Sequence, residues 1–453
     1  MESSESSPGT PSRDSADSPP TVATWTTSPD VSLLDVALDD DGSGASPAAS
    51  LSARRDEYVL VTGGLGFIGS HTVVELVKAG YNVIIVDDLS NSYRGVLDGI
   101  LEIARRHYEH HRQRRCPMVE MHQVSYRDLP AMRSILELHS FPGPAGAPPV
   151  RSNIVGVIHL AAYKAVEESI RHPLRYYQNN INGLVDLVAL LGEFAVKTFI
   201  FSSSAAVYGT LSAGGGRPLR EEICTHPAER AGTETGAPSS SSPPQSDGGG
   251  GGGGGITNPY GRTKFFAEAI LSDVAAADAS WRVVVLRYFN PVGCDASGLL
   301  ADNPRGVPSN LVPVVTQVMT GQRAALNIYG GDWDTRDGTA VRDFIHVSDL
   351  ARGHTAALEA CRDGRVDASY RTYNLGTGEG SSVLDVVRAM EAVSGRAIPR
   401  ETVARRDGDV AASVAAVDRA RRELCWETEK TLLDACYSVC SRLNLLPSRA
   451  GGA

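Results

Sequence analysis

Apolar runs rich in β-branched residues recur along the chain and alternate with segments of helical periodicity. They predict strands at residues 58–62, 82–86, 118–124, 154–160, 198–201, 282–288 and 373–375. Patterns between most of these runs predict helices, including residues 67–79, 174–194 and 259–274. Near-continuous apolar strands that alternate with helices are typical of a parallel sheet covered on both faces. We therefore predict an α/β fold with a Rossmann-type, doubly wound parallel sheet.

The pattern changes after residue 290, where loops and shorter helices at 311–320, 383–393 and 432–443 predict a smaller C-terminal lobe. We expect a Rossmann domain at 56–290, joined by 344–376, and a substrate-binding lobe at 291–343 and 377–445. Residues 141–151 are rich in Pro, Gly and Ala and predict a longer loop. Residues 211–257 hold an unbroken glycine run at 248–255 and predict a flexible insertion, for which a spacer is favoured over a regulatory element.

Composition separates the N-terminal segment from the rest of the 453-residue chain. Residues 1–55 are rich in Ser, Pro, Ala and Asp, and predict a disordered acidic tail; residues 446–453 predict a flexible one. Nine acidic and three basic residues in the first tail account for six of the ten net negative charges, which leaves a body near −4. The near-neutral body argues against nucleic acid as a partner.

The sequence has no apolar run long enough to cross a membrane and no secretory or transit signal. Seven scattered cysteines form no disulfide framework and suit a reducing compartment, so we expect a cytoplasmic protein without a membrane partner. Cys436 and Cys440 lie one helical turn apart, but no second ligand pair accompanies them, which disfavours a zinc site. We expect no metal.

A glycine-rich turn, LVTGGLGFIG at residues 60–69, follows the first predicted strand and opens the first helix. Gly63, Gly66 and Gly69 suit a tight turn, a close backbone approach to a pyrophosphate and close helix packing. The second strand ends at Asp87, about twenty residues further on, where a carboxylate suits ribose hydroxyls and repels a 2′-phosphate. The pattern predicts NAD rather than NADP. An ordinary turn is the alternative for the glycines, and a surface turn for Asp88.

Tyr260 and Lys264 lie four residues apart and therefore on one face of the predicted helix. An ammonium there favours the ionised phenol, so the pair predicts an acid/base. Ser204 closes a serine run after an apolar strand and is the candidate to hydrogen-bond a substrate hydroxyl. For Ser202 and Ser203 we favour a simple strand end, and a core tyrosine is the alternative for Tyr260.

Several segments together resemble the extended short-chain dehydrogenases/reductases, and within them the UDP-glucose 4-epimerases. The resemblance runs from about residue 58 to 443 outside the two insertions. It is carried by VTGGLGFIGSH at 61–71, YQNNING at 177–183, FIFSSS at 199–204, LRYFNPVG at 286–293, DGTAVRDFIHV at 337–347 and YNLGTG at 373–378.

The resemblance implies site residues beyond those read from the patterns. It implies contacts to NAD from Gly63, Gly66, Phe67, Ile68, Gly69, Asp87, Asn91, Ser92, Lys164, Asn179, Tyr260, Lys264 and Phe289. It implies contacts to a UDP-sugar from Ser204, Asn290, Asn310, Leu311, Tyr329, Arg342, Arg406 and Asp409. Arg342 and Arg406 suit a diphosphate because each presents a planar fork of donors, whereas Arg405 is expected in a surface salt bridge.

The implied activity is a reversible 4-epimerisation of a UDP-hexose in galactose metabolism, with tightly bound NAD and a 4-keto intermediate. We expect a homodimer. Rival functions are a 4,6-dehydratase or decarboxylase, which Ala205 and Ala206 disfavour because they offer no proton donor; an epimerase for another UDP-sugar; and a non-catalytic NAD-binding scaffold. Departures from the family pattern are Ser125, Ala162, Glu167 and Ala206, and the small Ser413 looks compatible with a 2-acetamido sugar.

Overall fold

The computed structural model describes residues 57–110, 116–141, 151–213, 217–231, 255–306, 308, 310–406 and 408–447. The expectations for the acidic tail, for residues 448–453 and for glycines 248–254 lie outside these residues. Among the described residues, no helix is long and apolar enough to cross a membrane.

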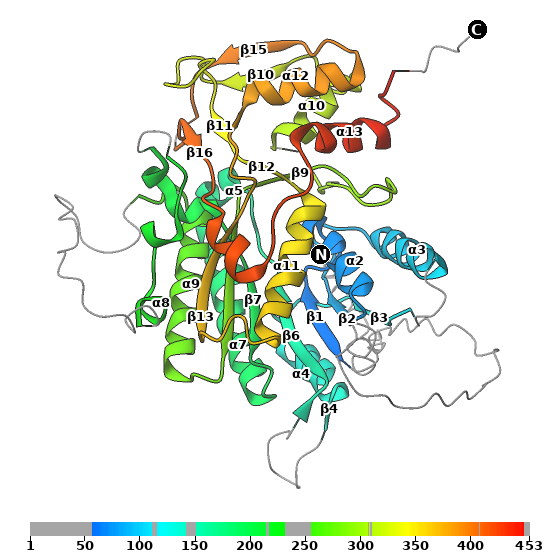
Figure 1. Ribbon diagram of the computed structural model, residues 1–453, viewed down its shortest axis with the longest axis vertical. Coiled ribbons are helices and arrows are strands. Elements are labelled where there is room, and N and C mark those ends of the chain that lie inside the picture. The colour runs from blue at the N-terminus through cyan, green and yellow to red at the C-terminus, as the bar shows by residue number, and fades with distance from the viewer. Residues whose placement is uncertain are drawn as a thin grey trace, which may run out of the picture.

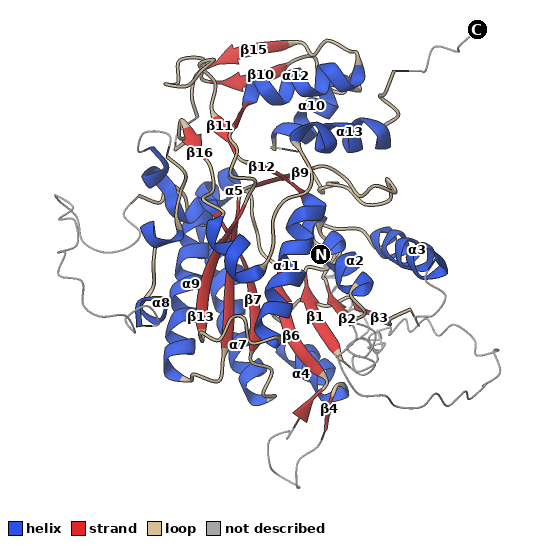
Figure 2. Ribbon diagram, in the orientation of Figure 1, coloured by secondary structure: helices blue, strands red, loops and turns tan. Residues whose placement is uncertain are grey.

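A seven-stranded parallel sheet forms the centre of the larger domain (Figures 1 and 2). Its strands run in the order β13-β8-β7-β6-β1-β2-β3, so the chain starts in the middle and builds outward on both sides. The doubly wound prediction is therefore confirmed. The strands are β1 (Tyr58–Thr62), β2 (Asn82–Val86), β3 (Val119–His122), β6 (Ile154–His159), β7 (Thr198–Ser204), β8 (Arg282–Tyr288) and β13 (Tyr370–Leu375).

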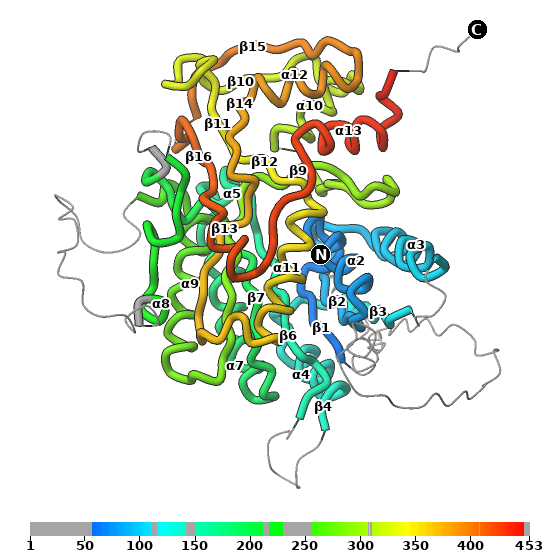
Figure 3. The backbone as a smooth tube through the Cα atoms, viewed as in Figure 1, coloured from blue at the N-terminus to red at the C-terminus, as the bar shows by residue number. Residues whose placement is uncertain are grey.

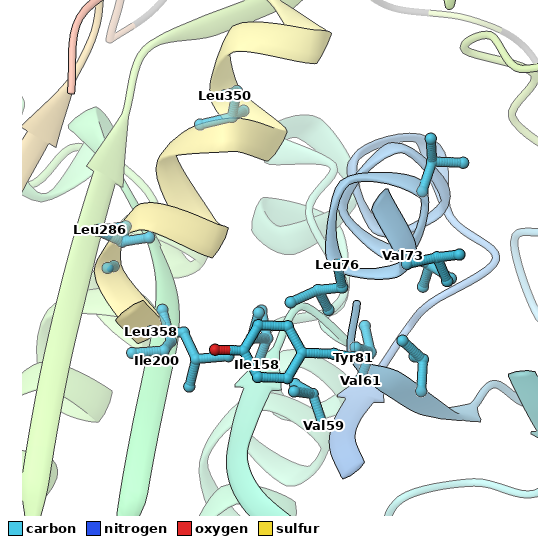
Figure 4. Close-up of a cluster of buried hydrophobic side chains, with 14 of the residues drawn as sticks. Val59, Val61, Val73, Leu76, Tyr81, Ile158, Ile200, Leu286, Leu350 and Leu358 are labelled. Carbon is cyan, nitrogen blue, oxygen red and sulfur yellow. The ribbon is translucent and has the colours of Figure 1, made fainter. Parts of the chain in front are cut away.

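Two layers of helices cover the sheet because successive strand residues point to opposite faces. Val59 and Val61 of β1 pack with α2 (Phe67–Lys78), α3 (Gly95–His110) and α11 (Val347–Arg362) on one face. Figure 4 shows part of this cluster, with side chains from β1, α2 and α11. Leu60 faces the other layer, which comprises α4 (Leu129–Leu138), α7 (Gly183–Glu193) and α9 (Pro259–Ala277).

The helix predicted over 174–194 is divided. The structure has α6 (Pro173–Tyr177), then a π-helical turn η1 (Gln178–Asn182), then α7. A short helix α5 (Val166–Arg171) precedes them. π-turns inside helices occur frequently at functional sites, and this one carries Asn179.

The smaller lobe follows β8 along the chain and has its own apolar core. Figure 3 shows its helices α10, α12 and α13 close together at the top of the view. Its helices are α10 (Leu311–Met319), α12 (Val383–Ser394) and α13 (Leu432–Arg442). Its strands pair as β10 (Leu326–Tyr329) with β15 (Arg400–Val403), and as β14 (Ser381–Ser382), β11 (Val341–Arg342) and β16 (Ala412–Ser413). The pair β9 (Asn290–Val292) and β12 (Phe344–His346) lies where the chain leaves and re-enters the larger domain.

The predicted insertion at 211–257 needs correction, because part of it is ordered structure. Residues 217–231 contain the 3-10 helix η3 (Glu221–Ile223) and helix α8 (Pro227–Ala231), which contacts β13. Leu219, Cys224 and His226 are buried. Further elements are η2 (Ala205–Ala213), η4 (Ala420–Leu424) and the antiparallel pair β4 (Ser140–Phe141) and β5 (Arg151–Ser152), which flanks residues 142–150 outside the described part.

Candidate active site

The glycine turn after β1 is too tight for side chains. Gly63 has φ +72°, and a Cβ there would lie 2.8 Å from the amide nitrogen of Ala161. A Cβ on Gly69 would lie 2.1 Å from the carbonyl oxygen of Gly63. Helix α2 begins after Gly66 with no side-chain cap and no acidic residue in its first turn. Its first amides therefore suit an anion such as a pyrophosphate.

Asp87 follows β2 and is held by three hydrogen bonds. Its Oδ2 accepts from the Leu65 amide at 2.9 Å, and its Oδ1 accepts from the Leu89 amide at 3.0 Å and from Ser92 Oγ at 2.7 Å. Two carboxylate oxygens offer about four lone-pair sites, so Asp87 keeps acceptor capacity for a ribose hydroxyl. Asp88 is exposed and accepts from the Ser90 amide at 2.9 Å, as expected of a turn residue.

A cleft of about 270 Å³ opens beside this turn. Its lining includes four of the predicted NAD contacts, Phe67, Asn91, Ser92 and Lys164, together with the loop at 299–304. The uncapped helix, the anchored carboxylate and the cleft fit NAD. Asn179 is buried, and its Nδ2 donates to Asn180 Oδ1 at 3.0 Å. Ile68 packs against the core, and Phe289 is buried in a separate apolar cluster.

Helix α9 presents Tyr260 and Lys264 to the carboxyl end of β7. The helix starts at Asn258, whose side chain caps the Gly261 amide at 2.8 Å, with Pro259 in the first turn. Burial raises the pKa of the Tyr260 phenol, and a hydrogen bond with Ser204 opposes the rise. Lys264 Nζ donates to the Ser202 carbonyl at 2.6 Å and lies 4.7 Å from the Phe201 ring centre. Burial lowers the pKa of Lys264 to about 7.

Ser202 and Ser203 do lie at the end of a strand, as we favoured, but the strand is longer than predicted. Both are fully buried inside β7, which runs three residues beyond its predicted end at 201. Ser202 Oγ lies 2.9 Å from His354 Nε2, and Ser203 Oγ donates to Glu268 Oε1 at 2.5 Å. Sequence reasoning missed Glu268 entirely, although its position four residues after Lys264 was a signal.

The lobe brings four of the predicted UDP-sugar contacts together. Arg342 pairs with Asp409 at 3.3 Å, and the Arg406 guanidinium lies 3.6 Å from the ring centre of Tyr329. The same arginine lowers the pKa of that phenol. Arg405 instead forms the expected surface pair, with Asp332 at 2.8 Å.

The other predicted contacts occupy element boundaries. Asn310 precedes α10 without a side-chain cap, and Leu311 is the first residue of that helix. Asn290 is exposed at the start of β9, where its amide donates to the Asp343 carbonyl at 2.9 Å.

The departures from the family pattern leave these groups in place. Ser125 lies outside regular structure, and its Oγ accepts from the Arg127 amide at 3.4 Å. Glu167 faces solvent, 3.5 Å from Arg171. The Ala206 amide donates to Ser204 Oγ at 3.2 Å. Ser413 pairs in register with Arg342, which places this small residue beside a predicted diphosphate contact.

Comparisons with known proteins agree with this geometry. Residues 59–376 match the family described as "NAD dependent epimerase/dehydratase family". The UDP-glucose 4-epimerase of Mus musculus is 43% identical over 383 residues, which cover 84% of this chain and 95% of the mouse protein. UDP-glucose 4-epimerase 2 of Arabidopsis thaliana is 40% identical over 381 residues, covering 84% and 93%.

Solved structures show the same similarity. UDP-glucose 4-epimerase from Bifidobacterium longum, in complex with NAD+ and UDP, superposes with a TM-score of 0.68 at 39% identity and covers 85% of this chain and 98% of its own. The enzyme from Stenotrophomonas maltophila, with bound NAD and formylated UDP-arabinopyranose, also gives 0.68, at 36% identity over 86% and 98%.

Proposed function

This chain belongs to the NAD dependent epimerase/dehydratase family, and we propose that it interconverts UDP-glucose and UDP-galactose by inverting C4 through a 4-keto intermediate, as part of galactose metabolism. The observation that carries the proposal is the group of buried Tyr260 and Lys264 with half-buried Ser204 at the carboxyl end of β7. The glycine turn before α2 and Asp87 would hold NAD, which would supply reversible hydride acceptance for this reaction.

The chain's own residues handle the proton. Tyr260 accepts the proton of the sugar 4-hydroxyl, and Ser204 shares a hydrogen bond with that phenol and orients the hydroxyl. Burial raises the pKa of the phenol, and the hydrogen bond with Ser204 opposes that rise, while Lys264 lies four residues further along the same helix, where its protonated form would favour the ionised phenol. Ala205 and Ala206 follow Ser204 and offer no proton donor for elimination, so the proton returns to the same oxygen and no net oxidation results.

Inversion requires the sugar to turn over while the nucleotide stays anchored. Arg342 and Arg406 suit the diphosphate, and the N-terminus of α10 at Asn310 adds open amides. Ser413, small and beside Arg342, favours room for a 2-acetamido group, so UDP-GlcNAc/GalNAc is a second substrate pair.

We also propose a cytoplasmic homodimer. Helices α5, α6, α7 and α9 each carry one large apolar side chain that is 43–74% exposed: Ile170, Leu174, Val185 and Phe266. Helices α5 and α6 both contact α9, and η1, which leads into α7, contacts α9 as well, so the four helices are neighbours. A second copy would cover them.

The test is a product assay with purified full-length protein. UDP-glucose should yield UDP-galactose without added reductant, and released NAD should match the protein concentration. A 6-deoxy-4-keto product would refute the proposal. Tyr260→Phe should abolish turnover yet keep UDP binding, and retained activity would remove Tyr260 as the base.

A further inference from the structure

The three serines that close β7 pair one by one with three successive turns of α9. Ser204 shares a hydrogen bond with Tyr260, Ser202 accepts from Lys264 through its carbonyl, and Ser203 donates to Glu268. Residues four apart lie above one another on a helix, so Tyr260, Lys264 and Glu268 form one face. The first two contacts belong to the proposed reaction, and the third has no role in it.

Glu268 is completely buried and is the centre of a charged network. Its carboxylate accepts from Arg287 Nη2 at 2.6 Å and from Arg287 Nε at 3.1 and 3.2 Å, and it lies 3.0 Å from His226 Nε2. Glu268 and Arg287 both have 0% exposed side chains. Burial alone would raise the pKa of the Glu268 carboxyl, but Arg287 and His226 hold it at about 2. Glu268 is therefore a carboxylate.

Arg287 carries this network to the segment that follows Ser204. It lies in β8, and its Nη1 donates to Tyr208 OH at 3.2 Å. Tyr208 belongs to η2, which begins directly after Ser204. Arg287 Nη2 donates to the Cys224 carbonyl at 2.7 Å. The chain is thus fixed on both sides of Ser204, at Ser203 by Glu268 and at Tyr208 by Arg287.

We propose that Glu268 and Arg287 are positioning residues for the reaction, which hold the end of β7 in register with α9 so that Ser204 stays against Tyr260. This inference rests on the proposed function. A buried ion pair is weak support for stability, because removing two charges from water offsets their attraction. A role in register explains why the pair contacts Ser203 before Ser204 and Tyr208 after it.

The first test compares two buried serines of different placement. Ser203→Ala removes the contact to Glu268 but keeps the ion pair. Ser272→Ala is the matched control, because Ser272 is equally buried in α9 but caps the Ala228 amide at 3.1 Å, away from β7. We expect Ser203→Ala to lower kcat about ten-fold at unchanged KM, since small misplacement of reacting groups is costly. Ser272→Ala should stay within about two-fold of wild type.

The second test changes charge and reads the pH profile. The titratable groups around Tyr260 and Lys264 are Glu268 on the same helix, His159 on β6, and Arg287 and Tyr288 on β8. Glu268 is the negative one among them, so Glu268→Gln should move the alkaline limb of kcat to lower pH by about one unit as Lys264 loses support for its proton. Glu229→Gln is the control, because the carboxylate of Glu229 is also buried but its hydrogen bonds go to Arg419 at 2.6 Å and to Thr372 of β13, and not to Ser203 or Arg287.

All rates are taken per folded molecule, measured by denaturant unfolding. The proposal is overturned if Ser203→Ala and Glu268→Gln match their controls in kcat and pH profile. A wild-type protein without interconversion refutes the proposed function instead. In that case the positioning role can still be tested by ultraviolet titration of the Tyr260 phenol, taken as the difference from Tyr260→Phe. The midpoint of this titration should rise in Ser203→Ala and stay unchanged in Ser272→Ala.

Discussion

Gly69→Ala tests whether the turn between β1 and α2 is an anion cradle. The added Cβ would lie 2.1 Å from the Gly63 carbonyl oxygen, where an ordinary contact begins at 3.4 Å. The turn must therefore open by about 1 Å, and overpacking of this kind costs about 1–3 kcal/mol. Alanine recovers about 1 kcal/mol of helix propensity, which leaves a modest net loss of stability.

The effect on NAD should be larger than the effect on folding. A shift of about 1 Å takes amide donors out of hydrogen-bond range of a phosphate oxygen. Loss of two bonds to a charged acceptor, at about 1.5–3 kcal/mol each, weakens NAD binding by at least about 100-fold. The assay measures NAD retained after gel filtration, together with urea unfolding of the same sample.

Gly192→Ala provides the matched control. Gly192 lies in α7, and a Cβ there would meet Trp281 at 3.7 Å, an ordinary contact. It should keep NAD and gain up to about 1 kcal/mol of stability. If Gly69→Ala retains NAD as Gly192→Ala does, the account of the turn is refuted.

Three further predictions follow from burial and anchoring. Burial lowers the pKa of four histidines to about 3 or 4, so the folded protein keeps them neutral: His71, His159, His346 and His354. Their contribution to the free energy of unfolding is complete above pH 6.5 and falls by about 1.4 kcal/mol per pH unit for each histidine as the pH decreases. Urea unfolding between pH 7 and 5 should therefore show proton uptake on unfolding. Asp87→Ala should lower stability by about 1–3 kcal/mol and release NAD, because the buried Leu65 amide loses its acceptor; an unchanged melting curve would contradict this. Deletion of residues 232–254 should leave kcat within two-fold, whereas extending it through Gly255 should reduce stability, because the Gly255 carbonyl accepts from the Thr210 amide at 2.8 Å.

The sequence predicted strands well where apolar side chains fill both faces of the sheet. The bounds of β1, β2 and β8 match the predicted ones. The prediction stopped β7 at Phe201 because hydrophobic patterning cannot recognise buried serines, whose hydroxyls are satisfied by His354 and Glu268 from distant parts of the chain. Such polar contacts depend on tertiary partners and leave no periodic signal.

The same limit explains the region 211–257, where composition predicted a single flexible stretch. Glu221 and Glu229 occupy the free edge of β13: their carboxylates accept from the amides of Asn374 at 2.8 Å and of Thr372 at 3.3 Å. They take the place of a neighbouring strand, which an edge otherwise leaves open. No local sequence pattern predicts that these glutamates accept hydrogen bonds from the edge of a strand.

The segment between Ser204 and Tyr260 is held by hydrogen bonds near both of its ends, which allows a long insertion without displacing Tyr260. Before residue 232 the chain is held at the β13 edge by Glu221 and Glu229, and after residue 254 by the Gly255 carbonyl. Asn258 then caps α9 and sets where Tyr260 begins the helix. Because closing a loop costs only about 0.6 kcal/mol more for each doubling of its length, chain can be added between the anchors without displacing the helix. Ser204 and Tyr260 therefore owe their proximity to the sheet and the Glu268–Arg287 pair, and not to the length of the connection between them.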